Sequence, residues 1–339
     1  MRRRAIAYAL LSAALFGAST PLAKLLLGAT SPLLLAGLLY LGAGVGLLIW
    51  SRGRLKPIAR GDVPWLAAAV AAGGIAGPAL LMFGLARTDA ATASLLLNLE
   101  AVFTAAIAWV AFRENVDRRV FAGMVAIVAG GALLSFEGTP HLQSGMLLIA
   151  AACFAWAMDN NFTRRISAGD AVTLACIKGL VAGSANLLFA LVQGAALPAP
   201  GIVAAAGVVG LFGYGVSLAL FIVALRELGT ARTAAYFSVA PFFGAALALI
   251  VLGGTAGWAF WGAALLMALG VWLHLSERHR HAHVHAPMAH EHEHVHDEHH
   301  RHAHEFAWDG SEPHTHPHRH AALSHSHSHH PDLHHRHSH

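Results

Sequence analysis

Charged residues are scarce in this sequence. Asp, Glu, Lys and Arg make up 12% of its 339 residues, while 56% are hydrophobic. Soluble domains have about twice that share of charge, roughly a quarter. Many of the acids also lie in a tail that begins near Glu277, so residues 1–276 carry even less charge. This shortage excludes an ordinary soluble domain and indicates a chain that lies largely within lipid.

Cysteine and catalytic motifs are also missing. The two cysteines, Cys153 and Cys176, fall inside apolar stretches, which favours small buried side chains over a disulfide framework. No loop contains a phosphate-binding motif, an activated nucleophile or a metal-activated water motif, so we expect no enzyme. The net charge of +4 comes from short basic groups between apolar runs. Basic groups that are dispersed in this way do not form the single basic face of a nucleic-acid-binding protein.

Long apolar runs dominate what is present. A hydrocarbon core of about 30 Å needs about 20 helical residues, and ten runs of suitable length have charges mainly at their ends. They cover approximately 5–27, 31–50, 64–86, 90–112, 119–136, 144–163, 171–193, 202–225, 231–252 and 256–275. The sequence therefore predicts an all-α integral membrane protein with ten transmembrane helices.

The loops between these runs indicate the direction of insertion. Lys and Arg favour the cytoplasmic side, and with the N-terminus inside nearly every basic group falls on that side. Arg87 is the exception. We expect a multi-pass protein of a bacterial-type inner membrane with both termini in the cytoplasm.

The chain also pairs with itself at an offset of 140 residues. Phe103–Ala108 aligns with Phe243–Ala248, Phe16 with Trp156, and Lys24 with Arg164. This alignment divides the chain into a first unit at 5–137, a second at 144–276 and a tail at 277–339. Because each unit has an odd number of spans, five, the second would enter the membrane from the opposite side, as in the inverted repeats of secondary transporters.

Several local motifs carry a family resemblance. They are Leu15-Phe-Gly-Ala-Ser-Thr-Pro21, the Ala-rich run ending Trp109-Val-Ala-Phe-Arg-Glu114, and Ala231-Arg-Thr-Ala-Ala-Tyr-Phe-Ser-Val-Ala-Pro241. In these the chain resembles the EamA-type transporters of the drug/metabolite transporter superfamily, with two repeats covering about 5–276. Near Glu100 and Ala101, where that family often has proline, this sequence has an acid. The resemblance implies an alternating-access carrier, commonly an exporter of small metabolites, that requires no cofactor.

Charged residues at membrane depth are the first candidates for a transport site, because each costs about 2.5–3.5 kcal/mol at a helix centre. Glu100 lies about ten residues into its span. Burial favours its neutral form, so it could take up and release a proton during transport. A protonated acid hydrogen-bonded between helices is the structural alternative. Asn98 and Thr104 share this helix and fit substrate contact or interhelical bonding equally well.

The span 144–163 contains the most polar triplet, Asp159-Asn160-Asn161. Asp159 could meet water, pair with Arg164 or Lys178, or bind substrate, and Trp156 could line the same cavity. Lys178 could snorkel to the cytoplasmic surface, pair with Asp159 or contact substrate.

Four further residues complete the candidate set. Tyr214 and Tyr236 could contribute hydroxyls, although buried aromatics usually serve packing. Pro21 and Pro241 are expected to interrupt their helices and free backbone carbonyls. Together with Glu100 and Asp159 they predict a cavity between the first, fourth, sixth and ninth spans. Lys24, near the outer end of the first span, is expected to snorkel outward.

The tail has a different composition. It holds all of the 26 histidines except His141 and His274. Such a segment cannot build a packed core and is expected to be disordered. Neutral imidazoles in His-x-His spacing are ligands for Zn, Ni, Co or Cu; the clearest runs are His281, His283 and His285, His292, His294 and His296, and His325, His327 and His329.

Three functions are therefore open. The first is a secondary carrier that exports a small metabolite or drug-like solute, with proton coupling through Glu100. The second is a divalent-metal efflux carrier supplied by the tail. The third is a membrane-anchored metal or pH sensor. The expected partners are a small solute, the lipid bilayer and divalent metal ions. Nucleic acid is not expected, and the sequence predicts neither the substrate nor the oligomeric state.

Overall fold

The structure is a computed structural model. It describes residues 2–112, 118–136, 140–166, 169–228, 233, 236–253 and 256–276, and in the tail 279–285, 288–294, 314–320 and 323–329. The chain forms two compact units, Met1–Glu277 and Arg278–His339. Each unit is described separately.

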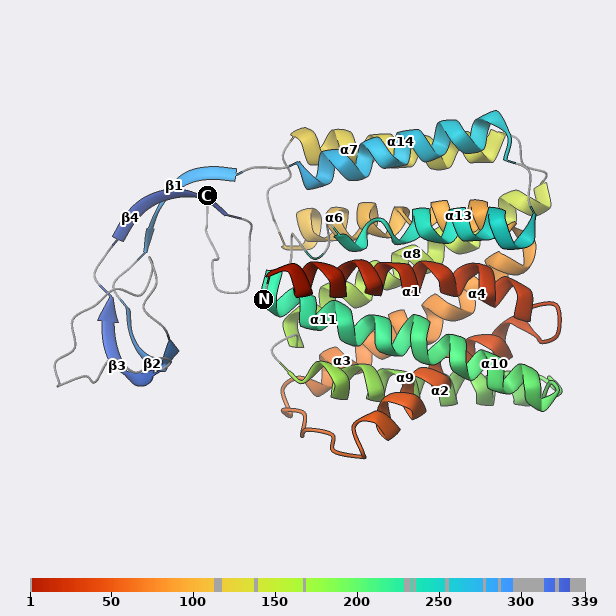
Figure 1. Ribbon diagram of the computed structural model, residues 1–339, viewed down its shortest axis with the longest axis horizontal. Helices are drawn as coiled ribbons and strands as arrows, with labels where there is room; N and C mark the ends of the chain where they lie inside the picture. The colour runs from red at the N-terminus through yellow and green to blue at the C-terminus, as the bar shows by residue number, and fades with distance from the viewer. Residues whose placement is uncertain are drawn as a thin grey trace. The chain divides into compact units, whose positions relative to one another are not determined.

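The first unit is a bundle of helices (Figure 1). Its described helices are α1 (Arg2–Leu26), α2 (Pro32–Trp50), α3 (Val63–Ala69), η1 (Val70–Ala76), α4 (Gly77–Arg87), α5 (Ala90–Leu96), α6 (Leu99–Phe112), α7 (Arg118–Phe136), α8 (Pro140–Ile166), α9 (Ala171–Val192), α10 (Pro200–Gly210), η2 (Leu211–Val216), α11 (Ser217–Leu228), α13 (Ala240–Leu252) and α14 (Trp258–Leu275).

Eight helical runs among the described residues are long and apolar enough to cross a membrane. In the order of the chain they are 4–26, 32–50, 63–87, 90–111, 118–135, 171–192, 200–224 and 258–275. α8 has 27 residues and carries Asp159 near its C-terminal end. α13 is a shorter apolar helix of 13 residues. Eight of the ten expected spans thus meet this criterion, and spans at α8 and α13 stay predictions.

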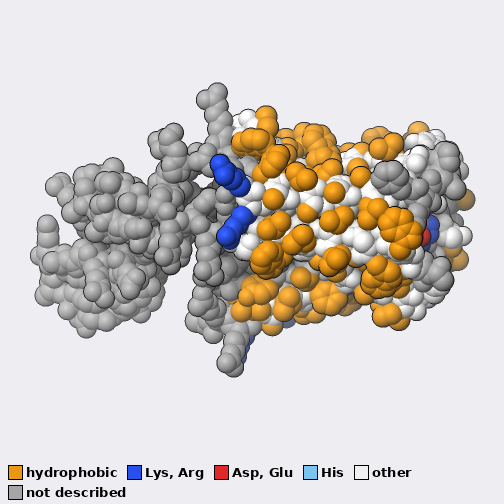
Figure 2. Space-filling view, turned by 90° about the horizontal axis from the view of Figure 1, so that it is seen from above, with side chains coloured by type: hydrophobic (Ala, Val, Ile, Leu, Met, Phe, Trp, Pro, Cys, Tyr) orange, Lys and Arg blue, Asp and Glu red, His pale blue; other side chains and the backbone are white. Residues whose placement is uncertain are grey.

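The surface of the bundle is apolar. Hydrophobic side chains cover the face seen in Figure 2, and Lys and Arg side chains lie at its ends. Large side chains such as Val110, Leu147, Val192, Ile250 and Leu265 are more than two-thirds exposed. Soluble monomers rarely expose continuous apolar patches of this kind. Cys153 and Cys176 are buried free thiols, as the sequence predicts.

Packing follows the repeat. At the 140-residue offset α2 corresponds to α9 and α7 to α14, and each of these helices packs on its own counterpart. The contact of α1 with α13 likewise has a counterpart in the contact of α8 with α6. In Figure 1, α7 and α14 lie side by side. The two halves thus resemble each other in packing as well as in sequence.

Three spans that the sequence predicts as continuous helices are irregular. η1 and η2 are π-helical segments inside the third and eighth predicted spans, and they occupy matching places in the repeat. The fourth predicted span divides at a turn over Leu97–Asn98, between α5 and α6. A second turn, Ser238–Val239, precedes α13. π-helical segments often occur at functional sites.

Pro21 does not break its helix, contrary to the sequence-based expectation. α1 continues from Arg2 to Leu26 with Pro21 inside it. Proline removes the hydrogen bond to the carbonyl four residues earlier, which belongs to Gly17. That carbonyl lies against Gly244 of α13, so close backbone packing accommodates it. Pro241, by contrast, stands in the first turn of α13, where its missing N–H costs little.

Four segments of the tail are described as strands, and the disorder expected for the tail as a whole stays a prediction. Its strands are β1 (His279–His285), β2 (Met288–His294), β3 (His314–His320) and β4 (Leu323–His329). β1 pairs antiparallel with β4, and β2 with β3. The His-x-His alternation has the two-residue period of a strand.

Candidate functional site

Glu100 stands at the start of a helix in the interior of its span. The turn at Leu97–Asn98 ends α5, and α6 then places Glu100 in its first turn. A carboxylate is favoured there by the positive end of the helix dipole. The side-chain amide of Asn160 on α8 donates a hydrogen bond of 2.7 Å from Nδ2 to Oε1 of Glu100. This contact joins α6 to α8.

The preceding residue on α8 makes an ion pair. Nζ of Lys178 on α9 lies 2.6 Å from both carboxylate oxygens of Asp159. Thr163, one turn further along α8, donates to Oδ1 of Asp159 at 2.8 Å. Asp159 is 7% exposed and Lys178 9% exposed. Of the alternatives for Lys178, the pair with Asp159 is confirmed and snorkelling is wrong, because the buried carboxylate holds the ammonium group inside the bundle.

A carbonyl of the π-helical segment η1 forms the third part of the site. Tyr40 of α2 donates to the carbonyl of Gly73 at 3.0 Å, and Nε1 of Trp156 donates to the same oxygen at 2.9 Å. Asn186 of α9 donates to the next carbonyls, with 3.2 Å to that of Ile75. Side chains from three helices thus satisfy carbonyls of an irregular segment.

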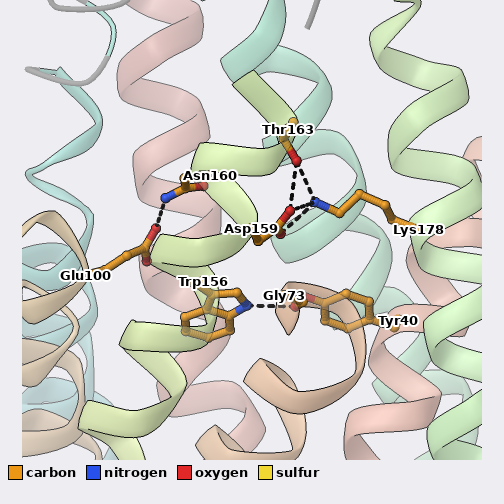
Figure 3. A network of polar contacts seen from close by, with 8 residues as sticks. All are labelled: Tyr40, Gly73, Glu100, Trp156, Asp159, Asn160, Thr163 and Lys178. Carbon is orange, nitrogen blue, oxygen red and sulfur yellow. Dashed lines mark hydrogen bonds and ion pairs between the residues drawn. The ribbon is translucent and has the colours of Figure 1, made fainter. Parts of the chain in front are cut away.

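Figure 3 shows how these groups share one helix. Trp156, Asp159 and Asn160 all come from α8; Asp159 lies toward Lys178, Asn160 toward Glu100, and Trp156 toward Gly73. Asp159 also lies directly against the Cα of Gly73, where a Cβ would overlap its carboxylate. We call Glu100, Asn160, Asp159, Lys178 and Thr163, with the Tyr40 and Trp156 contacts on Gly73, the polar cluster.

Aromatic rings border the polar cluster. Phe16 of α1 meets Trp156 with 6.2 Å between ring centroids, and it meets Tyr214 of η2 at 5.9 Å. Tyr214 also contacts Tyr40 at 5.3 Å, and Phe16 contacts Phe237 at 5.5 Å. Phe16 and Trp156 are counterparts in the repeat, so their contact lies where the two halves meet.

Some sequence candidates lie apart from the polar cluster. Asn98 donates to the carbonyl of Leu95 and to Sδ of Met267 on α14. Tyr236 packs against Ala5, Ala9 and Ala224. Thr104 follows Glu100 by one turn on α6, and its buried hydroxyl makes no hydrogen bond within the described structure.

Sequence reasoning missed four contributors to the polar cluster and the carbonyls beside it. Tyr40 stands out as a tyrosine in an otherwise apolar span, and Thr163 follows Asp159 at the four-residue helical spacing, so both had a signal in the sequence. Asn186 likewise stands out as an amide inside an apolar span. The role of Gly73 as an acceptor had no signal, because it depends on the π-helical backbone.

Lys24 also differs from expectation. Its ammonium group donates to the carbonyls of Leu85 and Thr88 at 2.6 and 2.8 Å. It therefore caps the C-terminal end of α4 rather than snorkelling outward, because those final carbonyls have no partner within the helix.

The described side chains contain no group of three or more His, Cys, Asp and Glu placed to hold a metal ion. The tail strands are described as backbone, so their predicted metal ligands are untested.

Apolar exposed helices around a partly buried polar cluster are features of a multi-pass membrane protein of the transporter class. The chain belongs to the EamA-like transporter family, whose model matches residues 3–136 and 143–276. Two EamA repeats are therefore present, beginning 140 residues apart as the self-alignment predicts. This is a family of transporters rather than of enzymes.

Individual relatives agree with this assignment. The chain is 30% identical over 261 residues to an uncharacterised transporter of Methanothermobacter thermautotrophicus, covering 70% of this chain and 76% of the relative. Over 80 residues it is 36% identical to a probable amino-acid metabolite efflux pump of Salmonella typhimurium, covering 23% of this chain and 27% of that protein. A solved crystal structure, 19% identical, has a similar fold with a TM-score of 0.61, covering 81% of this chain and 98% of that one.

Proposed function

We propose that this protein is a secondary active exporter of a small metabolite or drug-like solute, coupled to proton entry at Glu100. The observation that carries the proposal is the place of Glu100: an acid at a helix break in the interior of a span, bonded to a neutral amide. Such an acid alternates readily between protonated and ionised forms as its exposure to water changes. The name of the Salmonella relative supports an amino-acid-related solute.

The proposed transport cycle uses ten spans arranged as two inverted five-helix units. The counterparts α2 and α9, and α7 and α14, would form the contacts about which the halves rock. In this arrangement both termini are cytoplasmic and the membrane is a bacterial inner membrane. The packing symmetry and the basic loops support this topology.

Proteoliposomes test the coupling. The protein is reconstituted, loaded with a panel of labelled amino acids and amines, and given a proton gradient of either sign. We expect release of at least one solute to follow the gradient, and we expect Glu100→Gln to transport without this dependence. Asp62→Asn, an acid at the start of α3, is the matched control. Release that ignores the gradient in the unmodified protein would contradict proton coupling.

We propose as a second function that the tail binds Zn, Ni, Co or Cu. The strand register supports it, because β1 and β4 align three His–His pairs and β2 and β3 align three more. Opposed positions of antiparallel strands have Cβ atoms about 4.5–5.5 Å apart, and imidazole is a ligand that suits Zn, Cu and Ni.

Removal of residues 279–339 distinguishes between the possible functions of the tail. Metal binding that disappears while solute export continues indicates an accessory storage or sensing role. Loss of metal flux through the membrane favours the metal efflux carrier. Metal binding that is unchanged by the truncation contradicts a metal site in the tail.

A further inference from the structure

Lys24 joins two groups of helices. α1 packs mainly on α11 and α13, whereas α4 and α6 pack on α8. Nζ of Lys24 crosses from the first group to the second and donates to the carbonyls of Leu85 and Thr88 at 2.6 and 2.8 Å. These acceptors lie at the C-terminal end of α4, where carbonyls lack partners within the helix and attract a cation. Water can replace Lys24 at these carbonyls when the groups separate, so the contact is reversible.

Exposure differs between corresponding places in the two halves. Thr20, one turn before Lys24 on α1, is 1% exposed, whereas its counterpart Asn160 on α8 is exposed. Ala23 is fully buried, and its counterpart Thr163 is half-buried. The bundle is therefore closed beside Lys24 and more open beside Asn160, as in a carrier that is open to one side. In the topology proposed above, the closed end is the outer one.

The second half has the same parts in corresponding places. At the 140-residue offset Lys24 corresponds to Arg164 on α8, and Leu85 and Thr88 correspond to Leu225 and Leu228. Leu228 is the last residue of α11, so unpartnered helix-end carbonyls follow η2 as they follow η1. The structure describes Arg164 as backbone. Because α8 and α11 belong to different groups, a bond from Arg164 to α11 would also join the groups.

We propose that Lys24 and Arg164 are alternating latches, each a side chain that holds one end of the bundle closed. Lys24 closes the outer end in the state that the structure shows. Arg164 closes the cytoplasmic end in the opposite state by capping the carbonyls of Leu225 and Leu228. Exchanging one set of bonds for an equivalent set keeps the two states close in free energy, so that both are populated. This inference rests on the proposed export and adds two positioning residues to it.

Cysteine labelling measures whether the closed end opens. Thr20→Cys is introduced with Cys153 and Cys176 replaced by alanine, and a water-soluble maleimide is added to the protein in lipid nanodiscs, where it reaches both faces. Because Thr20 is buried, the labelling rate follows the population that is open at this end. We expect Lys24→Met to raise the rate about tenfold or more, since two hydrogen bonds from a charged group are lost. Arg164→Met should lower it, because the opposite state loses its latch.

Neighbouring arginines provide matched controls. Arg87 donates to the carbonyl of Phe83 within α4, and Arg165 lies over the ring of Trp65 on α3, which packs on α8. Arg87→Met and Arg165→Met should therefore leave the labelling rate unchanged. Lys24→Arg keeps a long cationic donor and should restore most of the slow labelling.

Three results would overturn the inference. They are an unchanged rate in Lys24→Met, an equal rise in Arg87→Met, or a rate in Arg164→Met that is unchanged or raised. Arg164→Met alone decides the matter if Lys24→Met does not fold. The assay needs neither solute nor gradient, so it is separate from export. Opposite shifts in a protein that exports no solute leave the inference intact and reject the proposed function, whereas export with unchanged labelling rejects the inference alone.

Discussion

Asp159 and Asp170 both face a lysine, but in different surroundings. Asp159 and Lys178 lie in the interior, with side chains 9% and 11% exposed. Asp170 lies 3.6 Å from Lys56, whose side chain is 74% exposed. A surface pair contributes about 0–1 kcal/mol because water screens it. In the interior, removing one partner leaves an uncompensated charge.

We therefore expect Lys178→Met to lower the free energy of unfolding by about 3–5 kcal/mol. The double variant Asp159→Asn/Lys178→Met should recover most of this loss, because no unpaired charge remains. Thermal unfolding in detergent measures both, with Lys56→Met as the surface control. A double variant as unstable as Lys178→Met would show that packing rather than charge holds these helices together.

Asp170 caps the N-terminus of α9. The backbone N–H of Thr173 donates to its carboxylate at 2.9 Å, and this bond lowers the pKa of Asp170 below its usual value. The ionised form is thus favoured in the fold. Its stabilisation is present above the unfolded pKa of about 3.9 and is lost as the pH falls through the lower folded value.

Asp170→Ala should accordingly cost about 0.5–2 kcal/mol at neutral pH. The difference from the unmodified protein should shrink as the pH falls below about 4, because both proteins then lack the charged cap. Unfolding followed by circular dichroism across this range measures the effect. A difference that grows on acidification would contradict the assignment.

At the scale of elements, the spans were predictable and their interruptions were not. Hydropathy places α2 and α9 within a residue or two of their observed ends, because a lipid-exposed helix needs a continuous apolar run. The turn after Leu96 has no glycine or proline at its two residues. Each π-helical segment contains two glycines, but regular helices such as α2 contain glycines too, so glycine does not distinguish them. Glu100 and Asp159 were found as charges at depth, whereas the partners of Gly73 depend on tertiary geometry.

Close helix packing gives a test at this scale. A Cβ on Gly210, at the end of α10, would overlap the backbone carbonyl of Leu39 on α2. Gly207 lies on the same helix and would meet nothing within 4 Å. We expect Gly210→Ala to destabilise the protein by about 1–3 kcal/mol through overpacking.

Gly207→Ala should be neutral or stabilising by up to about 1 kcal/mol, since alanine favours a helix over glycine. Thermal unfolding of the two variants side by side measures the contrast. Equal losses would mean that α10 and α2 do not approach each other this closely.

At the scale of the whole molecule, the repeat was the feature that sequence predicted best. The self-alignment and the family matches agree on the same offset. The inversion of one half relative to the other is inferred from the odd number of spans, five, in each half. An odd number makes the second half enter the membrane from the opposite side.

Gly61 and Gly201 are counterparts at the 140-residue offset, both exposed and free of close neighbours. In a background with Cys153 and Cys176 replaced by alanine, single cysteines at these places can be labelled with a membrane-impermeant maleimide. We expect Gly61→Cys to react from the cytoplasmic side and Gly201→Cys from the outer side. Labelling of both from one side would contradict inverted repeats.

The matching places of η1 and η2 bear on the history of the chain. A helix irregularity at the same register in both halves is what two copies of one ancestral unit would share. Three side chains donate hydrogen bonds to carbonyls of η1: Tyr40, Trp156 and Asn186. At the 140-residue offset their counterparts are Leu180, Phe16 and Gly46. The halves therefore differ here: side-chain donors bond to the carbonyls of η1, whereas the residues at the matching positions opposite η2 have no donor group in their side chains.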